Sequence, residues 1–172
     1  MALVPCRECG KEVSRVAAAC PNCGAPYPSK ATWKGYWGIN WKSRTTVFGL
    51  PLVHVAFGLN EYRRPMVAKG VIAIGQFAVG VITIAQFGIG LLFGLGQFLV
   101  GTVVVAQFAF AGLIGIGQIA SGILAIGQFV VGLYGLCQAG FAKYMWSPTR
   151  TDMEAVALFH TIYERILHLL GG

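Results

Sequence analysis

The chain has 172 residues, of which 56% are hydrophobic and only 11% are charged, compared with about 25% charged residues in a typical soluble domain. Residues 70–142 are a run of 73 positions without Asp, Glu, Lys, Arg or His. This composition argues against an ordinary soluble domain and makes a membrane-embedded segment the first explanation. The six acidic residues of the chain form no set of nucleophile, base and acid, so we expect a protein that is not an enzyme.

The net charge of +7 comes from residues 1–69, which carry ten Lys or Arg and three Asp or Glu. A basic flank beside an apolar block predicts that the flank stays in the cytoplasm, and the N-terminus has no apolar stretch typical of a signal peptide. We therefore expect a protein of the inner, cytoplasmic membrane with its N-terminal residues in the cytoplasm. Nucleic acid is a weaker candidate partner, because the basic residues are spread out rather than clustered.

Residues 1–28 contain the pattern CRECGKEVSRVAAACPNCG, in which two pairs of cysteines each enclose two residues. This spacing lets both sulfur atoms of a tight turn reach one ion, and two such pairs form a closed, structural tetrahedral site. A glycine follows each pair, at Gly10 and Gly24, where the backbone favours a positive φ. The expected Zn²⁺ ligands are Cys6, Cys9, Cys20 and Cys23.

This segment resembles the short zinc-ribbon family found at the N-termini of many bacterial proteins, membrane proteins among them, and CPNCGAPYP is its most typical part. The resemblance is confined to residues 1–28. It implies a small domain folded around Zn²⁺ that serves as a docking or adaptor module for a protein partner that it does not name. Two disulfides are the alternative use of four cysteines, but reduced thiols suit a cytoplasmic chain.

Residues 29–48 are expected to form a linker at the membrane interface. Aromatic rings alternate there with Lys34, Lys42 and Arg44, and such side chains suit the lipid headgroup layer because each has an apolar body and a polar end. Stacking of nucleic-acid bases on the rings and packing against the next domain are the alternatives. The interfacial residues are Trp33, Tyr36, Trp37 and Trp41, with Trp146 beyond the apolar block.

Residues 49–146 form an apolar, glycine-rich repeat. Glutamines recur at steps of 10 or 11 in the numbering, and two successive steps make one repeat unit, such as GVIAIGQFAVGVITIAQFGIG from Gly70. Within each repeat unit a small residue returns about every five positions, with short β-branched runs between. The glutamines are Gln76, Gln86, Gln97, Gln107, Gln118, Gln128 and Gln138.

This repeat favours a β-solenoid (β-helix) with coils of about 20–21 residues, in which the small residues lie where the chain bends. The rhythm is similar to that of the pentapeptide-repeat proteins, which build square β-helices, but the outward polar residues of that family are missing here. An α-helical multispan membrane protein is the alternative fold. The 16 glycines of residues 66–142 weaken that alternative, because each costs about 1 kcal/mol relative to Ala inside a helix.

Side chains of a strand alternate between its two faces, so the outside of such a coil would be apolar whichever set faced inward, and it would meet lipid or another protein. Five coils at roughly 4.8 Å each would span about 24 Å. The glutamines would stack as two hydrogen-bonded ladders, one of Gln76, Gln97, Gln118 and Gln138 and the other, on the opposite side, of Gln86, Gln107 and Gln128. We expect the ladders to face inward; facing outward, they would mark subunit contacts or a pore wall.

Residues 147–172 have the signals of an amphipathic α-helix. Thr151 and Glu154 fit a capping box, and Gly171 suits the C-terminal end. The helix could cover the open edge of the solenoid, lie in the membrane interface or pair with another subunit. Its apolar stripe consists of Val156, Phe159, Tyr163, Ile166 and Leu170.

Together these features predict a non-enzymatic, membrane-embedded β-helix protein that acts as a scaffold or anchor and carries a cytoplasmic zinc-ribbon adaptor. The expected partners are the lipid bilayer and further copies of the chain in a homo-oligomer. Two other functions stay open: an oligomeric pore or channel lined by the glutamine ladders, and a soluble, self-assembling solenoid whose apolar sides bury one another.

Overall fold

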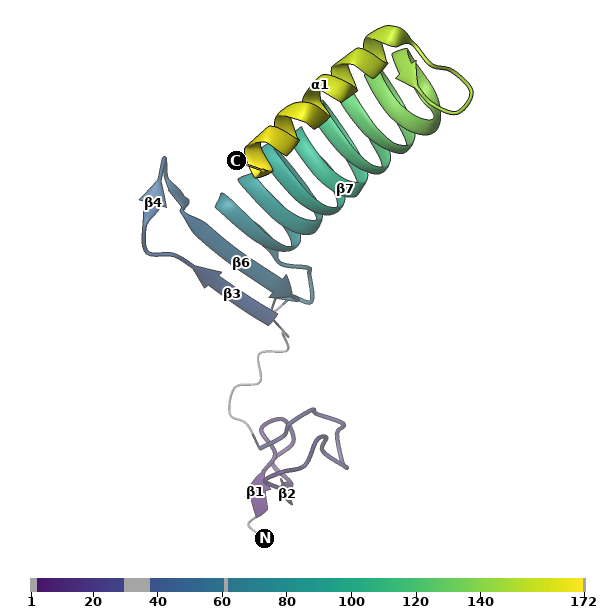
Figure 1. Cartoon of the computed structure of the whole chain (residues 1–172). Coiled ribbons are helices and arrows are strands. Elements are labelled where there is room, and N and C mark those ends of the chain that lie inside the picture. Colours follow the sequence, from purple (N-terminus) through teal and green to yellow (C-terminus); the bar gives the residue numbers. More distant parts are fainter. Residues whose placement is uncertain (1–2, 30–37, 61, 172) are drawn as a thin grey trace. The chain divides into compact units, whose positions relative to one another are not determined.

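The computed structural model describes residues 3–29, 38–60 and 62–171. The chain divides into two compact units, residues 1–36 with 61–63 and residues 37–60 with 64–172. As predicted, the described chain is mainly β and has a helix at its C-terminal end (Figure 1). The α-helical multispan alternative is not supported, because the apolar repeat is a strand. In the described ranges, no helix combines the length and the hydropathy needed to cross a membrane.

The first unit is a small ribbon in which β1 (Leu3–Pro5) pairs antiparallel with β2 (Glu12–Ser14). The two strands flank the first cysteine pair. Val13 and Ala25 are buried in a small cluster with Cys6 and Cys20. So few apolar side chains do not offset the entropy of ordering the segment, and the cysteines have to supply the remaining stability.

The second unit begins with a three-stranded sheet. β3 (Gly38–Lys42) pairs antiparallel with β6 (Val53–Gly58), and β6 pairs parallel with the start of β7. A hairpin of β4 (Thr46–Val47) and β5 (Leu50–Pro51) lies between β3 and β6 in the sequence. The expected linker of residues 29–48 therefore contains two strands, and β3 covers the edge that β6 would otherwise leave unpaired.

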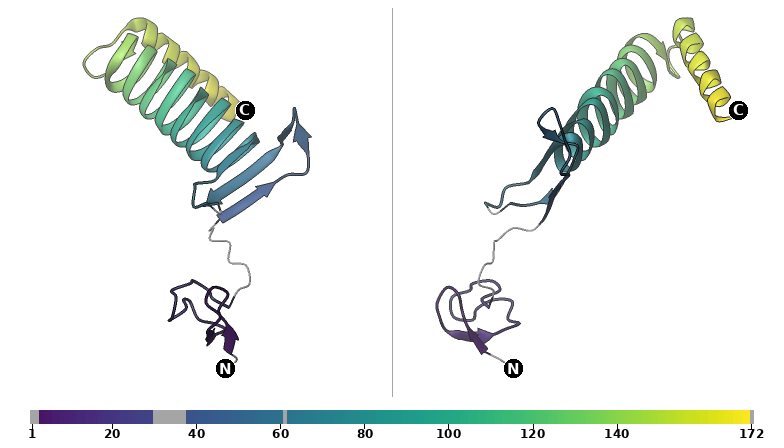
Figure 2. Two further views of the ribbon diagram at one scale, coloured as in Figure 1. Left: turned by 180° about the vertical axis from the view of Figure 1, so that it is seen from behind. Right: turned by 90° about the vertical axis from the view of Figure 1, so that its left-hand side faces the viewer.

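β7 (Val67–Trp146) is a strand of 80 residues that winds through successive turns (Figure 1, Figure 2); we call it the coil. Neighbouring turns approach closely at positions that are 10 or 11 apart. A Cβ atom on Gly96 would overlap the carbonyl oxygen of Ala85, and one on Gly127 would overlap that of Gly117. One turn is therefore as long as a single step between glutamines. The prediction of a coil twice as long is wrong, since each repeat unit makes two turns.

Small residues occupy the positions where adjacent turns come closest. At Gly101 and Gly132, as at Gly96, an added Cβ atom would meet a backbone carbonyl of the preceding turn, and at Gly75 it would meet the Ala56 carbonyl of β6. These positions belong to the series of small residues that returns about every five positions in the sequence. These positions allow two backbones to approach each other. At Gly90 of the same series an added Cβ atom would instead meet the carbonyl of Phe93, three residues further on, which fits the predicted role at a bend.

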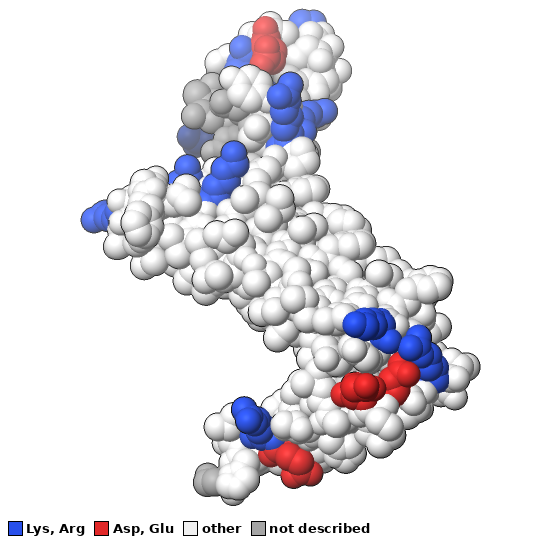
Figure 3. Space-filling model, turned by 90° about the horizontal axis from the view of Figure 1, so that it is seen from above, with Lys and Arg blue, Asp and Glu red and all other residues white. Residues whose placement is uncertain are grey.

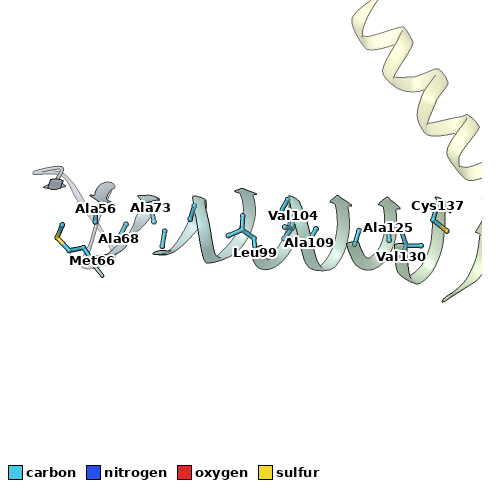
Figure 4. Close-up of a cluster of buried hydrophobic side chains, with 14 of the residues drawn as sticks. Ala56, Met66, Ala68, Ala73, Leu99, Val104, Ala109, Ala125, Val130 and Cys137 are labelled. Atoms are coloured by element: carbon cyan, nitrogen blue, oxygen red, sulfur yellow. The ribbon is translucent and has the colours of Figure 1, made fainter. Parts of the chain in front are cut away.

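The interior of the coil receives one side chain in every five. Ala73, Ala78 and Thr83 are buried at this interval, and buried side chains follow one another along the axis (Figure 4). Because half a turn has about five residues, each turn sends two side chains inward from opposite sides. The Thr83 hydroxyl donates to the carbonyl of Ile89 at 2.8 Å, so this buried polar group is satisfied. The other buried residues of the coil are mostly small: Ala68, Ala85, Leu99, Val104, Ala106, Ala109, Ala120, Ala125, Val130, Cys137 and Met145.

Where a large side chain points into this narrow core, glycine at a neighbouring inward position leaves space for it. Leu99 is fully buried, and Gly88 and Gly94 lie beside it, where a Cβ atom would be 3.2 Å and 3.3 Å from its methyl groups. Val130 lies against Gly135, where a Cβ atom would be 2.8 Å from a Val130 methyl group. Side chains therefore fill the interior at these levels, and it is not hollow there.

The outside of the coil is apolar along its length. Large side chains such as Ile89, Leu92 and Phe110 are exposed. Strict alternation would bury half of the side chains, whereas one in five faces the interior. The apolar outer surface predicted from the sequence is present, and it is larger than alternation alone would make it.

The C-terminal helix α1 (Met153–Leu170) begins with Asp152 as its N-cap, and no side-chain capping bond forms. The predicted capping box of Thr151 and Glu154 is therefore wrong. The carboxylate of Asp152 instead accepts a hydrogen bond from the Met145 amide at 2.8 Å and pairs with Arg150 at 3.0 Å. These contacts fasten the start of the helix to the last turn of the coil.

The helix packs on the coil near its start. Ala155 and Phe159 are its buried residues. The rings of Phe159 and His160 lie against Trp146 of the coil, with centroids 6.5 Å and 6.0 Å from that of the indole. The later part of the predicted apolar stripe, from Tyr163 onward, is exposed. The stripe is therefore used for packing in its first turns only.

Candidate metal centre and glutamine row

Two tight turns of the first unit bring the four cysteines together. The amide of Gly10 donates to the carbonyl of Cys6 at 2.8 Å, and the amide of Gly24 donates to the carbonyl of Cys20 at 2.9 Å. Both glycines have the expected positive φ, 70° and 74°, a conformation that costs glycine little. Because the two turns follow the same pattern, each presents its pair of sulfur atoms in the same way.

The Sγ atoms of the four cysteines all lie within 4.8 Å of one another. Those of Cys6 and Cys23 are 3.8 Å apart, and those of Cys9 and Cys20 are 3.7 Å apart. A disulfide bond is about 2.05 Å long, so these pairs are not disulfides. Ligands around a tetrahedral ion with metal–sulfur bonds of about 2.3 Å are separated by about 3.8 Å. The four thiols thus have the geometry to hold one metal ion.

The backbone and the crowding of the sulfur atoms act in opposite directions on the thiol pKa values. The amide of Lys11 lowers the pKa of Cys9 to about 6, and the amide of Cys23 lowers the pKa of Cys20. Although the amide of Ala25 favours its thiolate, partial loss of solvent and the neighbouring thiols raise the pKa of Cys23 to about 12. Four thiolates repel one another unless a cation lies between them, so a bound metal ion would let all four ionise.

The environment of the cysteines is that of a structural centre. Cys6 and Cys20 are buried, whereas Cys23 lies at the surface. The Lys11 ammonium donates to the side-chain oxygen of Asn22 at 2.7 Å, which joins the two cysteine turns at their outer edge. With four protein ligands, a tetrahedral ion has no coordination position left for water or a substrate.

The seven glutamines form one straight line on the outside of the coil, which we call the Gln row. Their spacing of 10 or 11 positions places one on each turn. The phenylalanines that directly follow four of them also stack in a line: Phe77, Phe87, Phe98 and Phe108 have successive ring centroids 5.6, 6.1 and 5.9 Å apart. Gln76 is half-buried, and the other six glutamines are exposed.

The predicted arrangement of the glutamines is wrong in two respects. They lie on one side of the coil rather than on two, because successive members are one full turn apart. They also point outward, and within the described parts of the chain none of the seven amides has a hydrogen-bond partner. The inward positions form a different series, such as Ala73, Ala78 and Thr83, and the glutamines do not fall on it.

Of the five aromatic residues predicted at the membrane interface, the structure describes two. Trp33, Tyr36 and Trp37 are outside the described residues. Trp41 is an exposed member of β3. Trp146 is the surface on which α1 packs, so it is partly covered by the helix.

A pair of tyrosines at the C-terminal end of the coil was not predicted, although Trp146 was. Tyr134 and Tyr144 stack with ring centroids 5.0 Å apart, and the Lys143 ammonium lies 5.1 Å from the centroid of the Tyr144 ring. The two tyrosines are ten positions apart, which is one step between neighbouring glutamines. A predicted turn of ten residues would therefore have placed the two rings side by side.

His54, at the other end of the coil, was also not predicted. The ring is buried. The Lys69 amide donates to its Nδ1 atom at 2.7 Å, and its Nε2 atom lies 3.0 Å from the side-chain oxygen of Asn40. His54 therefore ties β3, β6 and the start of β7 together, which is a structural role.

Charge separates the coil from the segments around it. No charged residue lies between Lys69 and Lys143, and the surface along the coil is free of blue and red atoms on the face shown in Figure 3. Comparisons of the chain with protein-family models, curated proteins and solved structures find no match. A function therefore has to be inferred from the geometry of the chain itself.

Proposed function

We propose that the protein is a non-enzymatic scaffold or anchor whose coil is a β-helix embedded in the lipid bilayer, with the four-cysteine unit as a cytoplasmic zinc-ribbon adaptor. The observation that carries this proposal is the length of the uncharged part of the coil. Its 73 positions, at 10 or 11 per turn, make about seven turns, and about 4.8 Å per turn gives about 33 Å. The hydrocarbon core of a bilayer is about 30 Å thick.

The backbone of the coil suits lipid, which offers no hydrogen bonds to an unpaired amide or carbonyl. Each inner turn has a neighbour on both sides. The first turn pairs with β6, and the Ile72 amide donates to the carbonyl of Leu52, just before that strand, at 2.8 Å. At the first edge, β3 pairs with β6. At the last edge, the Met145 amide and carbonyl both bond to Asp152.

The residues at the two ends of the coil also support a membrane location. Tryptophan, tyrosine and lysine are enriched where a protein passes the lipid headgroups. Trp41 and Lys42 belong to the strand that covers the first edge. Lys143, Tyr144 and Trp146 belong to the last turn.

Zn²⁺ is the ion that the four thiolates suit best, because soft sulfur ligands in a closed tetrahedron are its usual structural site. Reduced thiols are the expected state in the cytoplasm. The ion would hold the small unit folded and leave its surface free to bind a protein partner.

A pore through the coil itself conflicts with its interior, because Leu99, Val104 and Val130 are buried there. A pore could form only between copies of the chain, with their Gln rows facing water. A soluble assembly would have to cover the whole apolar outside of the coil with other copies.

The membrane proposal is tested by placing one positive charge at two depths. Phe108 lies near the middle of the uncharged run and Phe141 near its end, and their exposed fractions are 39% and 75%. A lysine costs about 2–4 kcal/mol at the bilayer midplane and about 0–1 kcal/mol near the interface. We expect wild type and Phe141→Lys to resist carbonate extraction from membranes, and Phe108→Lys to be largely lost from the pellet.

The control for the lost aromatic ring is Phe108→Leu, which should stay in the membrane pellet. Equal pelleting of the two lysine variants would contradict a membrane-embedded coil. A folded wild-type monomer in the aqueous fraction would contradict it as well. Ion flux through liposomes that contain the protein would favour the pore over the scaffold.

A further inference from the structure

The Gln row is a line of polar groups on a surface that is otherwise apolar. Its amides point outward from the coil, one per turn, over seven turns. Within the described residues, no side chain or backbone group of the same chain bonds to them. In lipid, a polar group without a partner is costly, which favours association with a surface that can supply hydrogen bonds.

The neighbourhood of the row lets another chain come close. Small residues directly precede the glutamines, and in the C-terminal half they form a shallow groove of about 460 Å³. Gly117, Gly127 and Cys137 line this groove beside the row, and Ile126 and Leu136 line it on the far side. Gln118, Gln128 and Gln138 line the same groove, so their amides can be reached from outside the coil.

The helix α1 leaves the row accessible. Its Phe159 and Tyr163 line an apolar cavity together with Ile126 and Leu136 of the coil. Gln138, the member of the row nearest to the helix in sequence, is exposed. The amides are therefore not reserved for contacts with the helix of the same chain.

We propose that the Gln row is the surface on which a second copy of this chain binds, with two coils side by side in the bilayer and their rows facing each other. This inference rests on the proposed membrane function. An amide is both a donor and an acceptor, so a row of amides is complementary to an identical row. A second copy has the same rise per turn, which keeps amide opposite amide along the whole coil.

The two copies lie parallel, because the basic residues before the coil hold every copy in the same orientation across the membrane. Each glutamine then meets its own counterpart, so Gln86 meets Gln86. In an antiparallel pair centred on Gln107, Gln86 would meet Gln128 instead. A cysteine at position 86 therefore distinguishes the two arrangements.

The test is disulfide crosslinking of the full chain in membranes, in a Cys137→Ala background. Alanine occupies the equivalent position at Ala85 and Ala106, so this background should fold. We expect Gln86→Cys to form a disulfide-linked dimer on mild oxidation. The matched control is Leu91→Cys. Leu91 is 65% exposed but lies half a turn away, on the opposite side of the coil. This variant should form no more disulfide-linked dimer than the Cys137→Ala parent.

The outcomes separate this proposal from the membrane function. Equal crosslinking at positions 86 and 91, or no crosslinking at position 86 in protein that pellets with membranes, would overturn the interface. Crosslinking of Gln107→Cys without that of Gln86→Cys would overturn the parallel arrangement. Protein that does not pellet with membranes contradicts the proposed function itself, whatever the crosslinking shows.

Crosslinking shows only how close the two rows lie, so a second variant tests whether the amides stabilise the dimer. Replacing Gln97, Gln107 and Gln118 with leucine keeps the apolar surface and removes three amides from each copy. We expect the dissociation constant of the dimer in detergent to rise roughly tenfold, in line with the modest strength of such bonds in membranes. An unchanged constant would show that the row does not hold the pair together.

Discussion

The four-cysteine unit and the coil reach a folded state by different means. The unit has a very small apolar cluster and four sulfur atoms around one point, where the proposed metal ion would supply most of its stability. The coil has a core of two side chains per turn, which is thin but continues through a strand of 80 residues. Loss of one ligand should therefore abolish the first structure, whereas loss of one core residue should weaken the second only locally.

The largest effect is expected for Cys20→Ser. A structural zinc site contributes about 10–16 kcal/mol of apparent binding free energy, and the unit has little else to hold it together. We expect metal content to fall to background and residues 3–29 to become sensitive to protease, while the circular dichroism of the coil stays unchanged. Cys137→Ala should keep both the metal and the protease resistance; loss of the coil together with the metal would contradict the independence of the two regions.

A smaller effect is expected for Leu99→Ala in the core of the coil. The cavity that it leaves should lower the free energy of unfolding by about 2–5 kcal/mol, measured by denaturant titration. Adding Gly94→Ala should restore part of this loss, because the new Cβ atom would occupy space that the Leu99 side chain had filled. The matched control Leu91→Ala removes an exposed leucine, and an equal loss there would argue against the buried core.

The junction between coil and helix should show an intermediate sensitivity. Asp152→Ala removes the carboxylate that bonds to the Met145 amide, and hydrogen bonds to charged groups contribute about 1.5–3 kcal/mol. We expect the helix to detach and the fluorescence of Trp146 to shift towards that of an exposed indole. Glu154→Ala, in the first turn of the same helix, should leave the spectrum unchanged.

The smallest effect, and an increase in stability, is expected at the β4–β5 hairpin. Phe48 has a positive φ of 51° and a fully exposed side chain, and a left-handed conformation is unfavourable for such a residue. Phe48→Asn should raise the free energy of unfolding by about 0.5–1 kcal/mol, since Asn tolerates this conformation. Val47→Asn should give no gain; a fall in stability for Phe48→Asn would mean that the ring has a partner in the folded protein.

Local patterns predicted the parts of the fold that depend on neighbouring residues. The spacing of Cys6, Cys9, Cys20 and Cys23 determines two tight turns, and those turns bring the sulfur atoms to one point. The glycine content weakened the helical alternative through the cost of glycine inside a helix. The structure gives these residues a further use, since Gly96 and its equivalents allow close contact between backbones.

The length of a turn could not be obtained in the same way. The steps between Gln76, Gln86 and Gln97 alternate between 10 and 11, so the sequence repeats only after two steps although the chain completes a turn at each. The inward positions lie five apart and carry residues as different as Ala73, Thr83 and Leu99, which conceals them. Once the inward series is known, the direction of the glutamines follows, since none of them falls on that series.

The junctions were difficult to predict for a different reason. Thr151 and Glu154 fit the local rule for a helix start, but the Asp152 carboxylate is held by the Met145 amide on the preceding turn. A contact of this kind depends on where the coil ends in space, which no pattern within the helix records.

Because every turn is short and regular, the length of the coil is set by the number of its turns. Each turn touches only the turn before it and the turn after it, so the cross-section does not depend on how many turns there are. Insertion or deletion of one repeat unit would change the length of the coil by two turns, about 10 Å. The remaining turns would keep the same residues in contact between neighbouring turns. Chains of this design could be matched to layers of different thickness by whole units, without any redesign of the core.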